Sequence, residues 1–296
     1  MMAEEQQQRM ELADSRGGRD ESSAASAHSA LEFAARSFFG LLLAAAAVAA
    51  NIAGGWIFAA LVAAASVSAV REWHRMIEPS RFRLELVVTA AAIVAAIGVA
   101  AAMPYQGWSW LLLFAGALAS ALLAGWRKTR QFWQAFGALY IGVAAVSLVT
   151  IRSGVTRGEW IVFGLFIVIW AADSGALLAG RLIGGPKLVP LLSPNKTWAG
   201  FIGGVLLAAL GEAIYIAVFD GNYWLGGLFG VCLGLVASGG DLFESWVKRI
   251  FRRKNSGSLI PGHGGVLDRI DSTLFVAPVG AILLLVGIDT LFGAHP

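Results

Sequence analysis

The sequence predicts an all-α, polytopic integral membrane protein with about nine transmembrane helices, and three observations carry this prediction. Hydrophobic residues make up 57% of the 296 residues, whereas charged residues make up 14%. The mean hydropathy is +0.70. Apolar runs of about 20 residues recur from Ser37 to the C-terminus, and a helix of that length crosses a hydrocarbon core about 30 Å thick. Together these observations exclude an ordinary water-soluble domain.

The N-terminal residues differ from the rest of the chain. They are polar, contain a Gln run and scattered acidic residues, and lack the regions of a signal peptide. We expect residues 1–36 to form a disordered cytosolic tail. Alanine and glycine are abundant in the apolar runs that follow, which suits close helix packing in lipid. The nine predicted spans are 37–53, 55–70, 86–103, 108–125, 132–151, 159–180, 198–219, 224–247 and 273–292.

The distribution of basic residues predicts the topology. With nine spans, 20 of the 22 Lys and Arg residues fall in the tail and in the loops on one side of the membrane. The opposite side holds only Arg152 and Arg157. Because cytosolic loops are rich in Lys and Arg, the N-terminus is predicted to be cytosolic and the C-terminus to lie outside.

One acidic residue lies inside the sixth predicted span. Asp173 occurs in IWAADSGALLAGR, well within apolar sequence. An ionised carboxylate in this position is unfavourable unless it is paired or lines a wet cavity, so Asp173 is a candidate functional residue. Alternatively, it forms a structural hydrogen bond between helices or an ion pair with Arg181.

The segment before the seventh span is rich in polar side chains. Residues 193–197 (SPNKT) supply hydroxyls, an amide and an ammonium group directly before a helix start. The N–H groups of a helix N-terminus, together with a lysine and hydroxyl groups, form a phosphate site. The alternative is an ordinary N-cap beside a lysine that reaches the membrane surface.

The eighth span ends in a row of polar residues. Asp241, Ser245 and Lys248 are spaced i, i+4 and i+7 and share one helix face, with Glu244 at its margin. A deep carboxylate with cations above it suits Mg²⁺, which binds one or two carboxylates together with substrate phosphates. The alternative is a basic membrane anchor at residues 252–254 plus a Glu244–Lys248 ion pair. It explains the basic residues well and Asp241 poorly.

A glycine-rich segment precedes the ninth span. Residues 261–265 (PGHGG) cannot form a helix, and their glycines let the backbone approach a ligand and offer N–H groups to an anion. A helix that starts near Val266 would place Asp268 and Asp271 on one face. Arg269 would point elsewhere and bind a phosphate or pair with an acid. Alone the segment is weak evidence, since Asp268 also suits an N-cap.

These polar segments all lie on the predicted cytosolic side, and their chemistry favours phosphoryl or nucleotidyl transfer. Such reactions need cations and backbone N–H groups around a triphosphate, with carboxylates that hold Mg²⁺. A lipid substrate would explain a site at the membrane surface. The sequence contains no HExxH, GxSxG or Walker A motif, and its single cysteine, Cys232, excludes a disulfide framework. After the tail, we therefore divide the chain into N-terminal transmembrane helices (37–151) and a catalytic transmembrane region with cytosolic loops (152–296).

A long motif resembles that of a known family. The segment SWVKRIFRRKNSGSLIPGHGGVLDRIDS, residues 245–272, resembles the signature of the phosphatidate cytidylyltransferases, or CDP-diacylglycerol synthases. Residues 193–204 and 172–184 are similar to two further blocks of that family. The matching positions of the signature are Ser245, Lys248, Arg249, Lys254, Gly257, Pro261, His263, Gly264, Gly265, Asp268, Arg269 and Asp271.

The resemblance implies that CTP and phosphatidate react to give CDP-diacylglycerol and pyrophosphate in phospholipid biosynthesis. It also implies a Mg²⁺ requirement and a place in the bacterial inner membrane, with the active site facing the cytosol and no nucleic acid partner. The sequence leaves open whether a monovalent cation joins Mg²⁺ and whether the chain forms a homodimer. Two positions depart from the family pattern: Asn255 replaces an Asp and Leu177 replaces a Tyr. The first change puts a metal or base role at position 255 in doubt.

The predicted site residues form overlapping groups. Asp241 and Asp268 match the family's metal-binding acids. The predicted catalytic residues are Asp241, Asp268, Lys248, Arg249, Arg269 and Asp271. The residues predicted to bind CTP or its phosphates are Asp173, Ser193, Asn195, Lys196, Thr197, Ser245, His263, Gly264 and Gly265.

Three alternative functions stay open. The nearest is another CTP-dependent lipid enzyme, either a prenol or polyprenol kinase or a cytidylyltransferase for a different lipid. A second is a membrane transporter or channel that uses Asp173 and Asp241 as coupling residues. The third is a catalytically inactive scaffold, weakened at Asn255.

Overall fold

The computed structural model describes residues 40–78, 84–257 and 264–285, and within these ranges it is almost entirely helical. Residues 40–46 begin the helix Gly40–Ala53 and belong to a separate unit, so the bundle described below contains the described residues from Ala47 onward. Its helices are α2 (Gly55–Ile77), α3 (Leu84–Ala102), α4 (Trp108–Trp126), α5 (Gln131–Gly154), α6 (Gly158–Leu182), α7 (Trp198–Val218), α8 (Tyr223–Ile250) and α9 (Leu267–Leu285).

The helices have the length and composition of membrane spans. Among the described residues, seven helices, α2 to α8, are long and apolar enough to cross a membrane. This agrees with the prediction of a polytopic integral membrane protein. Most helix bounds lie within about three residues of the predicted spans, as expected when long apolar runs define them.

Two helices extend beyond their predicted spans at the same end of the bundle. Helix α2 continues to Ile77 rather than residue 70, because Trp73, Met76 and Ile77 are buried in the core. Helix α9 starts at Leu267, six residues before the predicted span, which agrees with the expected helix start near Val266. Both extensions are partly polar, so hydropathy alone does not reveal them.

A small antiparallel hairpin was not predicted. Strands β1 (Lys187–Val189) and β2 (Ser193–Thr197) pair in the segment that the sequence suggested was only a loop. The strands are too short to show an alternating pattern in the sequence. The hairpin leads directly into α7, so it fixes the backbone of residues 193–197 in front of that helix.

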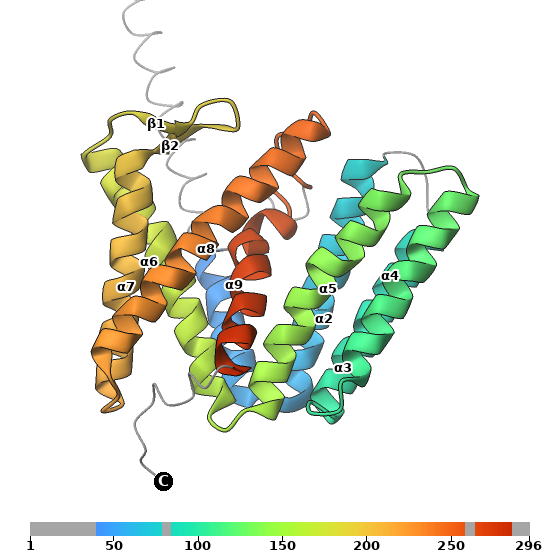
Figure 1. Ribbon diagram of the computed structural model, residues 1–296, viewed down its shortest axis with the longest axis horizontal. Coiled ribbons are helices and arrows are strands. Elements are labelled where there is room, and N and C mark those ends of the chain that lie inside the picture. The colour runs from blue at the N-terminus through green and yellow to red at the C-terminus, as the bar shows by residue number, and fades with distance from the viewer. Residues whose placement is uncertain (1–39, 79–83, 258–263, 286–296) are drawn as a thin grey trace, which may run out of the picture. The chain divides into compact units, whose positions relative to one another are not determined.

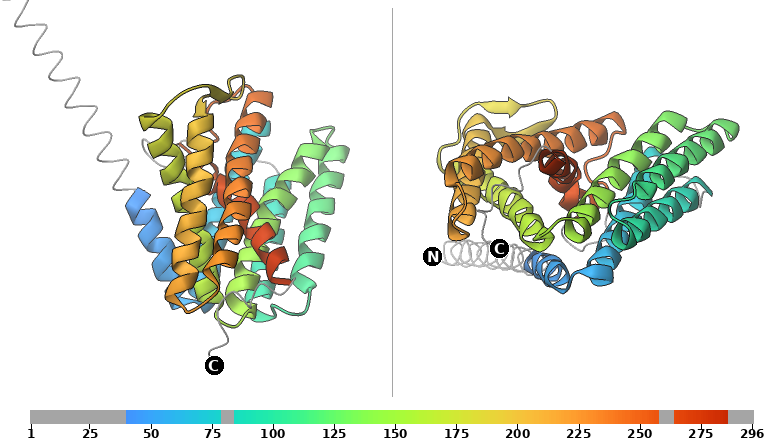
Figure 2. Two further views of the ribbon diagram at one scale, coloured as in Figure 1. Left: turned by 60° about the vertical axis from the view of Figure 1, so that its left-hand side comes forward. Right: turned by 60° about the horizontal axis from the view of Figure 1, so that its bottom comes forward.

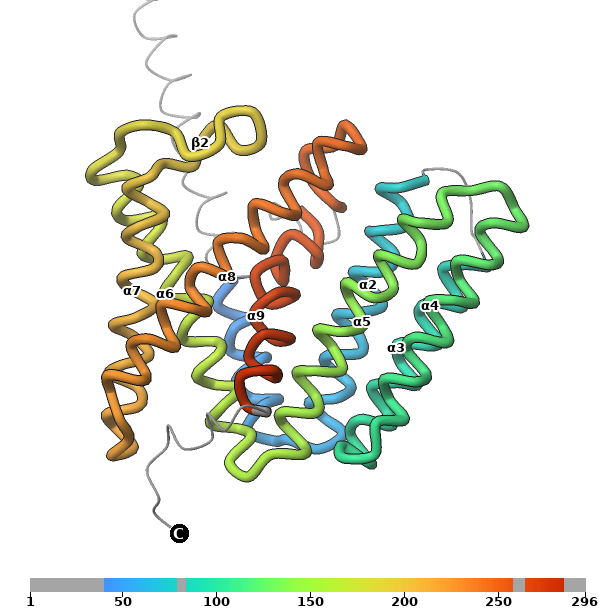
Figure 3. Tube along the Cα trace, in the orientation of Figure 1, coloured from blue at the N-terminus to red at the C-terminus, as the bar shows by residue number. Residues whose placement is uncertain are grey.

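Helix α9 lies at the centre of the bundle. It contacts α2, α5, α6 and α8, so it joins the N-terminal helices to the C-terminal ones. Figure 1 shows α2 to α5 on one side of α9 and α6 and α7 on the other, while α8 runs obliquely past α9. The views in Figure 2 and the chain trace in Figure 3 show the same arrangement.

Helices α6, α7 and α8 pack closely through small residues. A Cβ atom on Gly175 of α6 would lie 2.5 Å from the Gly203 carbonyl oxygen of α7. A Cβ atom on Gly230 of α8 would lie 2.6 Å from the Ala208 carbonyl oxygen. These backbones could not approach one another if the glycines carried side chains, as is common between membrane helices.

The two ends of the bundle differ in charge. The hairpin, the C-terminal end of α8 and the start of α9 lie toward one end (Figure 1), which we call the site end. Of the described basic residues, Arg152 and Arg157 lie at the opposite end, at the α5–α6 turn. The helix pairing therefore brings together the loops that the charge distribution assigned to one side of the membrane.

Candidate active site

A cavity of about 260 Å³ lies at the site end between α6, β2, α7 and α8. Helix α6 lines it with one face, since Ala172, Asp173, Ala176, Leu177 and Gly180 are spaced one helical turn apart or adjacent. Strand β2 contributes Asn195, Lys196 and Thr197, and α8 contributes Ala237, Ser238 and Asp241. Three segments that are distant in the sequence thus supply the polar groups of one cavity.

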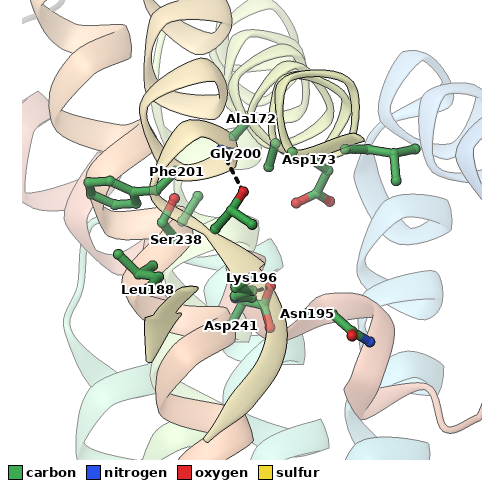
Figure 4. Close-up of a pocket in the computed structure, with 14 residues that line it drawn as sticks. Ala172, Asp173, Leu188, Asn195, Lys196, Gly200, Phe201, Ser238 and Asp241 are labelled. Carbon is green, nitrogen blue, oxygen red and sulfur yellow. Dashed lines mark hydrogen bonds and ion pairs between the residues drawn. The ribbon is translucent and has the colours of Figure 1, made fainter. Parts of the chain in front are cut away.

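An ion pair occupies the cavity. The Lys196 Nζ atom lies 2.5 Å from Asp241 Oδ2, and the two side chains are 26% and 36% exposed. Figure 4 shows these side chains meeting near the Asp173 carboxylate. Asp173 interacts electrostatically with Asp241, Lys196 and Arg269. Because the pair is partly solvated, an anionic ligand can compete for Lys196 and a cation for Asp241.

Thr197 connects the hairpin to α7. Its side chain is buried, and its Oγ1 atom accepts a hydrogen bond of 3.1 Å from the Gly200 N–H, so Thr197 is the N-cap of α7. This was the alternative to a phosphate-binding role. Thr197 also lines the cavity, and the positive end of the α7 dipole faces that region.

A second charge cluster joins α8 to α9. The Lys248 Nζ atom lies 2.9 Å from Asp268 Oδ1 and 3.2 Å from Glu244 Oε1. Glu244 is fully buried, and the Lys248 and Asp268 side chains are 14% and 9% exposed. Lys248 was predicted to be catalytic. In the structure it lies between two carboxylates, and it is absent from the residues that line the cavity.

The backbone around Asp268 holds its carboxylate in place. Asp268 Oδ2 accepts hydrogen bonds of 2.9 Å from the Gly265 N–H and 3.1 Å from the Ser256 N–H. Lys248 donates a further hydrogen bond of 2.9 Å to Asp268 Oδ1. Both carboxylate oxygens therefore have donors, and Asp268 is fixed in position.

Gly264 is required beside Asp268. Its φ angle is +85°, which favours glycine, and a Cβ atom there would lie 2.7 Å from Asp268 Oδ2. The glycines were predicted to let the backbone approach a ligand closely. At Gly264 the backbone instead approaches the Asp268 side chain of the protein itself. His263 lies outside the described residues.

The remaining predicted residues are dispersed around the cavity. Arg249 Nε donates a hydrogen bond of 3.2 Å to the Leu192 carbonyl, which ties the end of α8 to the hairpin. Arg269 is exposed, and Asp271 interacts electrostatically with Asp241 and Asp173. Ser193 and Ser245 are half-buried and are not among the residues that line the cavity.

The arrangement of the acids limits how they could bind a metal. In the part of the chain that the structure describes, no three His, Cys, Asp or Glu side chains gather to hold an ion. Mg²⁺ takes most of its ligands from water and substrate phosphates, so one or two carboxylates suit it. Asp241 opens into the cavity. Asp268 already accepts hydrogen bonds from Lys248 and two backbone amides, so a cation at Asp268 would have to displace one of them.

One residue of this region was missed by the sequence reasoning. Glu72 of α2 is 4% exposed, and its carboxylate accepts hydrogen bonds from the Val266 N–H, the Leu267 N–H and the Ser256 hydroxyl. The buried residues Val70 and Trp73 on either side of it continue the helical pattern past the predicted span. That periodicity was a usable signal for the helix, but nothing near Glu72 in the sequence indicates its partners.

Comparisons with known proteins identify the family of this chain. The sequence profile of the cytidylyltransferase family matches residues 34–286, which include all of α2 to α9. The chain is 40% identical to the phosphatidate cytidylyltransferase of Brucella suis biovar 1 over 199 residues, which cover 61% of this chain and 72% of that protein.

Two further relatives match over shorter stretches of the chain. The chain is 40% identical over 148 residues to the phosphatidate cytidylyltransferase of Staphylococcus saprophyticus, covering 49% of this chain and 56% of that protein. It is 42% identical over 142 residues to that of Rickettsia felis, covering 45% of this chain and 63% of that protein. Because the family profile matches most of its length and these relatives share about 40% of their aligned residues with it, this chain belongs to the cytidylyltransferase family.

Proposed function

We propose that this chain transfers CMP from CTP to phosphatidate, which gives CDP-diacylglycerol and pyrophosphate. The relatives reported above are named for this activity. The structural observation that carries the proposal is the partly open Lys196–Asp241 pair in the cavity. It offers a cation to the triphosphate and a carboxylate to a metal ion at the same place.

The reaction is a direct displacement on phosphorus. A phosphate oxygen of phosphatidate attacks the α-phosphorus of CTP and forms the new P–O bond. The bond between the α-phosphorus and its bridging oxygen breaks, and pyrophosphate leaves with the electron pair. Phosphatidate is already anionic at neutral pH, so no residue has to accept a proton. Lys196 and Arg269 stabilise the negative charge on the reacting phosphates.

Asp241 is the carboxylate best placed to hold Mg²⁺ with the triphosphate. When bound there, Mg²⁺ would neutralise phosphate charge. Asp268, fixed beside Lys248, would complete the site only after exchange of one of its donors.

The proposed topology places the site end in the cytosol, where CTP is available. Nine spans are obtained when Gly40–Ala53 and α9 are added to the seven helices that are long and apolar enough. The proposed location is the bacterial inner membrane, with a cytosolic N-terminus. The concentration of basic residues at the site end supports this orientation.

The test uses purified full-length protein in detergent with phosphatidate, Mg²⁺ and CTP labelled at either the α- or the γ-phosphorus. CMP transfer predicts that only the α label enters the lipid and that pyrophosphate release requires phosphatidate. Entry of the γ label would establish a lipid kinase instead. Absence of both labels from the lipid would favour an inactive scaffold and identify Asn255 as the first position to restore to Asp.

A further inference from the structure

We infer that Glu72 of α2 is a positioning residue that holds the described parts of the loop between α8 and α9, residues 251–257 and 264–266, and thereby places Asp268. This inference rests on the proposed function, because it assigns Asp268 a part in CMP transfer. It gives the N-terminal helices a role in the site, although none of their residues lines the cavity.

The first argument is the number of hydrogen bonds that one buried carboxylate accepts. Glu72 Oε1 accepts a bond of 3.0 Å from the Val266 N–H. Glu72 Oε2 accepts bonds of 2.9 Å from the Leu267 N–H and 3.2 Å from the Ser256 hydroxyl. Val266 and Leu267 stand at the start of α9, where a helix has N–H groups without partners in the helix itself and favours a negative charge. Glu72 therefore caps α9 from another helix.

The second argument is that Glu72 and Asp268 hold the same loop. Ser256 donates its hydroxyl to Glu72 and its backbone N–H to Asp268. The Gly265 N–H goes to Asp268, whereas the next two amides go to Glu72. Because the donors to the two carboxylates lie on the same residue or on adjacent residues, a movement of these residues away from Glu72 would also break the bonds that fix Asp268.

The third argument is steric. A Cβ atom on Gly257 would lie 2.6 Å from Glu72 Oε1, and one on Gly265 would lie 2.3 Å from Glu72 Oε2. The loop backbone therefore wraps the carboxylate more closely than any residue with a side chain would allow. Glycine is therefore needed at positions 257 and 265 of the signature to make room for the Glu72 carboxylate, without any contact to a ligand.

The test compares Glu72→Gln with Glu85→Gln in the full-length protein. Glu85 is also a fully buried acid of the N-terminal helices, but it pairs with Arg127 at 3.2 Å and has no contact with the loop among the hydrogen bonds of the described residues. Glu72→Gln places an amide NH₂ against backbone donors. We expect kcat to fall about 10- to 100-fold, as for other residues that orient a functional carboxylate, with a smaller change in the KM for CTP. Glu85→Gln is expected to keep the wild-type kcat in the folded fraction.

Hydrogen exchange supplies a readout that does not depend on activity. In Glu72→Gln, the amides of Val266, Leu267, Ser256 and Gly265 are expected to lose protection, while those of α5 keep it. Ser256→Ala is the milder second variant, because it removes one bond to Glu72 and leaves the backbone N–H to Asp268. It is expected to lower kcat a few-fold without loss of folded protein.

The outcomes separate this inference from the proposed function. If wild-type protein transfers no CMP, the proposed function fails, and the exchange data still decide whether Glu72 holds the loop. If wild-type protein is active and Glu72→Gln keeps its kcat and its Gly265 protection, the inference is overturned. Equal losses of kcat in Glu72→Gln and Glu85→Gln would also overturn it, since they would show only a general effect of burying an amide.

Discussion

Two lysine–carboxylate clusters at the site end use the same residue types in different surroundings. Lys196 and Asp241 meet in a cavity and are partly exposed, and the described hydrogen bonds give neither carboxylate oxygen of Asp241 a backbone donor. Lys248 and Asp268 are nearly buried, and Asp268 also receives two backbone amides. A solvated pair can exchange partners with a ligand, whereas a buried, fully hydrogen-bonded pair resists exchange.

This difference separates two tasks. The open pair suits the binding of a charged substrate and its cation, because each member can be released at low cost. The fixed pair suits the maintenance of geometry, since its partners come from α8, α9 and the loop between them. The variants below change one cluster at a time, so they test whether stability and activity separate as the two environments require.

The largest effect is expected for Asp268→Asn. The substitution removes the charge that pairs with Lys248 and presents an NH₂ group to the amides of Ser256 and Gly265. Because Lys248 keeps Glu244 at 3.2 Å, the free energy of unfolding should fall by about 2 kcal/mol rather than more. Turnover should fall by about 100-fold or more. Denaturation in detergent and CMP transfer at saturating Mg²⁺ measure the two effects, and near-normal turnover would remove Asp268 from the reaction.

Asp241→Asn should affect activity without the same loss of stability. Asp241 is 36% exposed, so loss of its ion pair should change the free energy of unfolding by less than about 1 kcal/mol. Turnover should fall by about 100-fold, and the Mg²⁺ concentration for half-maximal activity should rise. A Mg²⁺ titration of wild type and variant checks this. If Asp241→Asn destabilises the protein as much as Asp268→Asn does, the contrast between an open and a fixed cluster is wrong.

Some features of the fold and the site could be predicted from the sequence because they depend on neighbouring residues alone. The spans were predictable because long apolar runs leave few alternatives in a membrane. The unusual acids Asp173 and Asp241 were also found, since charges inside apolar runs are conspicuous, and the structure places both at the cavity. Both predictions depend on information that is local in the sequence.

The pairing of these residues was not predictable in the same way. Lys196 meets Asp241 across 45 positions of the sequence, and Glu72 meets Leu267 across 195. Such contacts depend on how helices pack, which the residues near each acid do not encode. The hairpin was missed for another reason: β1 and β2 have three and five residues, too few for a periodic pattern.

The smallest effect is expected at Thr197, which is the N-cap of α7 and also lines the cavity. Thr197→Ala removes the acceptor of the Gly200 N–H. Asn222→Ala removes the N-cap of α8, whose side chain accepts hydrogen bonds from the Trp224 and Leu225 N–H groups. Asn222 lies at the end of α8 that is farther from the cavity. Each change should lower the free energy of unfolding by about 1 kcal/mol.

Only Thr197 lines the cavity, so only Thr197→Ala should also raise the KM for CTP, by a few-fold. Thr197→Ser keeps the hydroxyl and should restore both properties. Thermal unfolding and steady-state kinetics of the three variants decide the matter. If Thr197→Ala and Asn222→Ala have the same KM, the Thr197 hydroxyl serves the helix alone, and the phosphate-binding part of the cavity reduces to Lys196 and the neighbouring backbone.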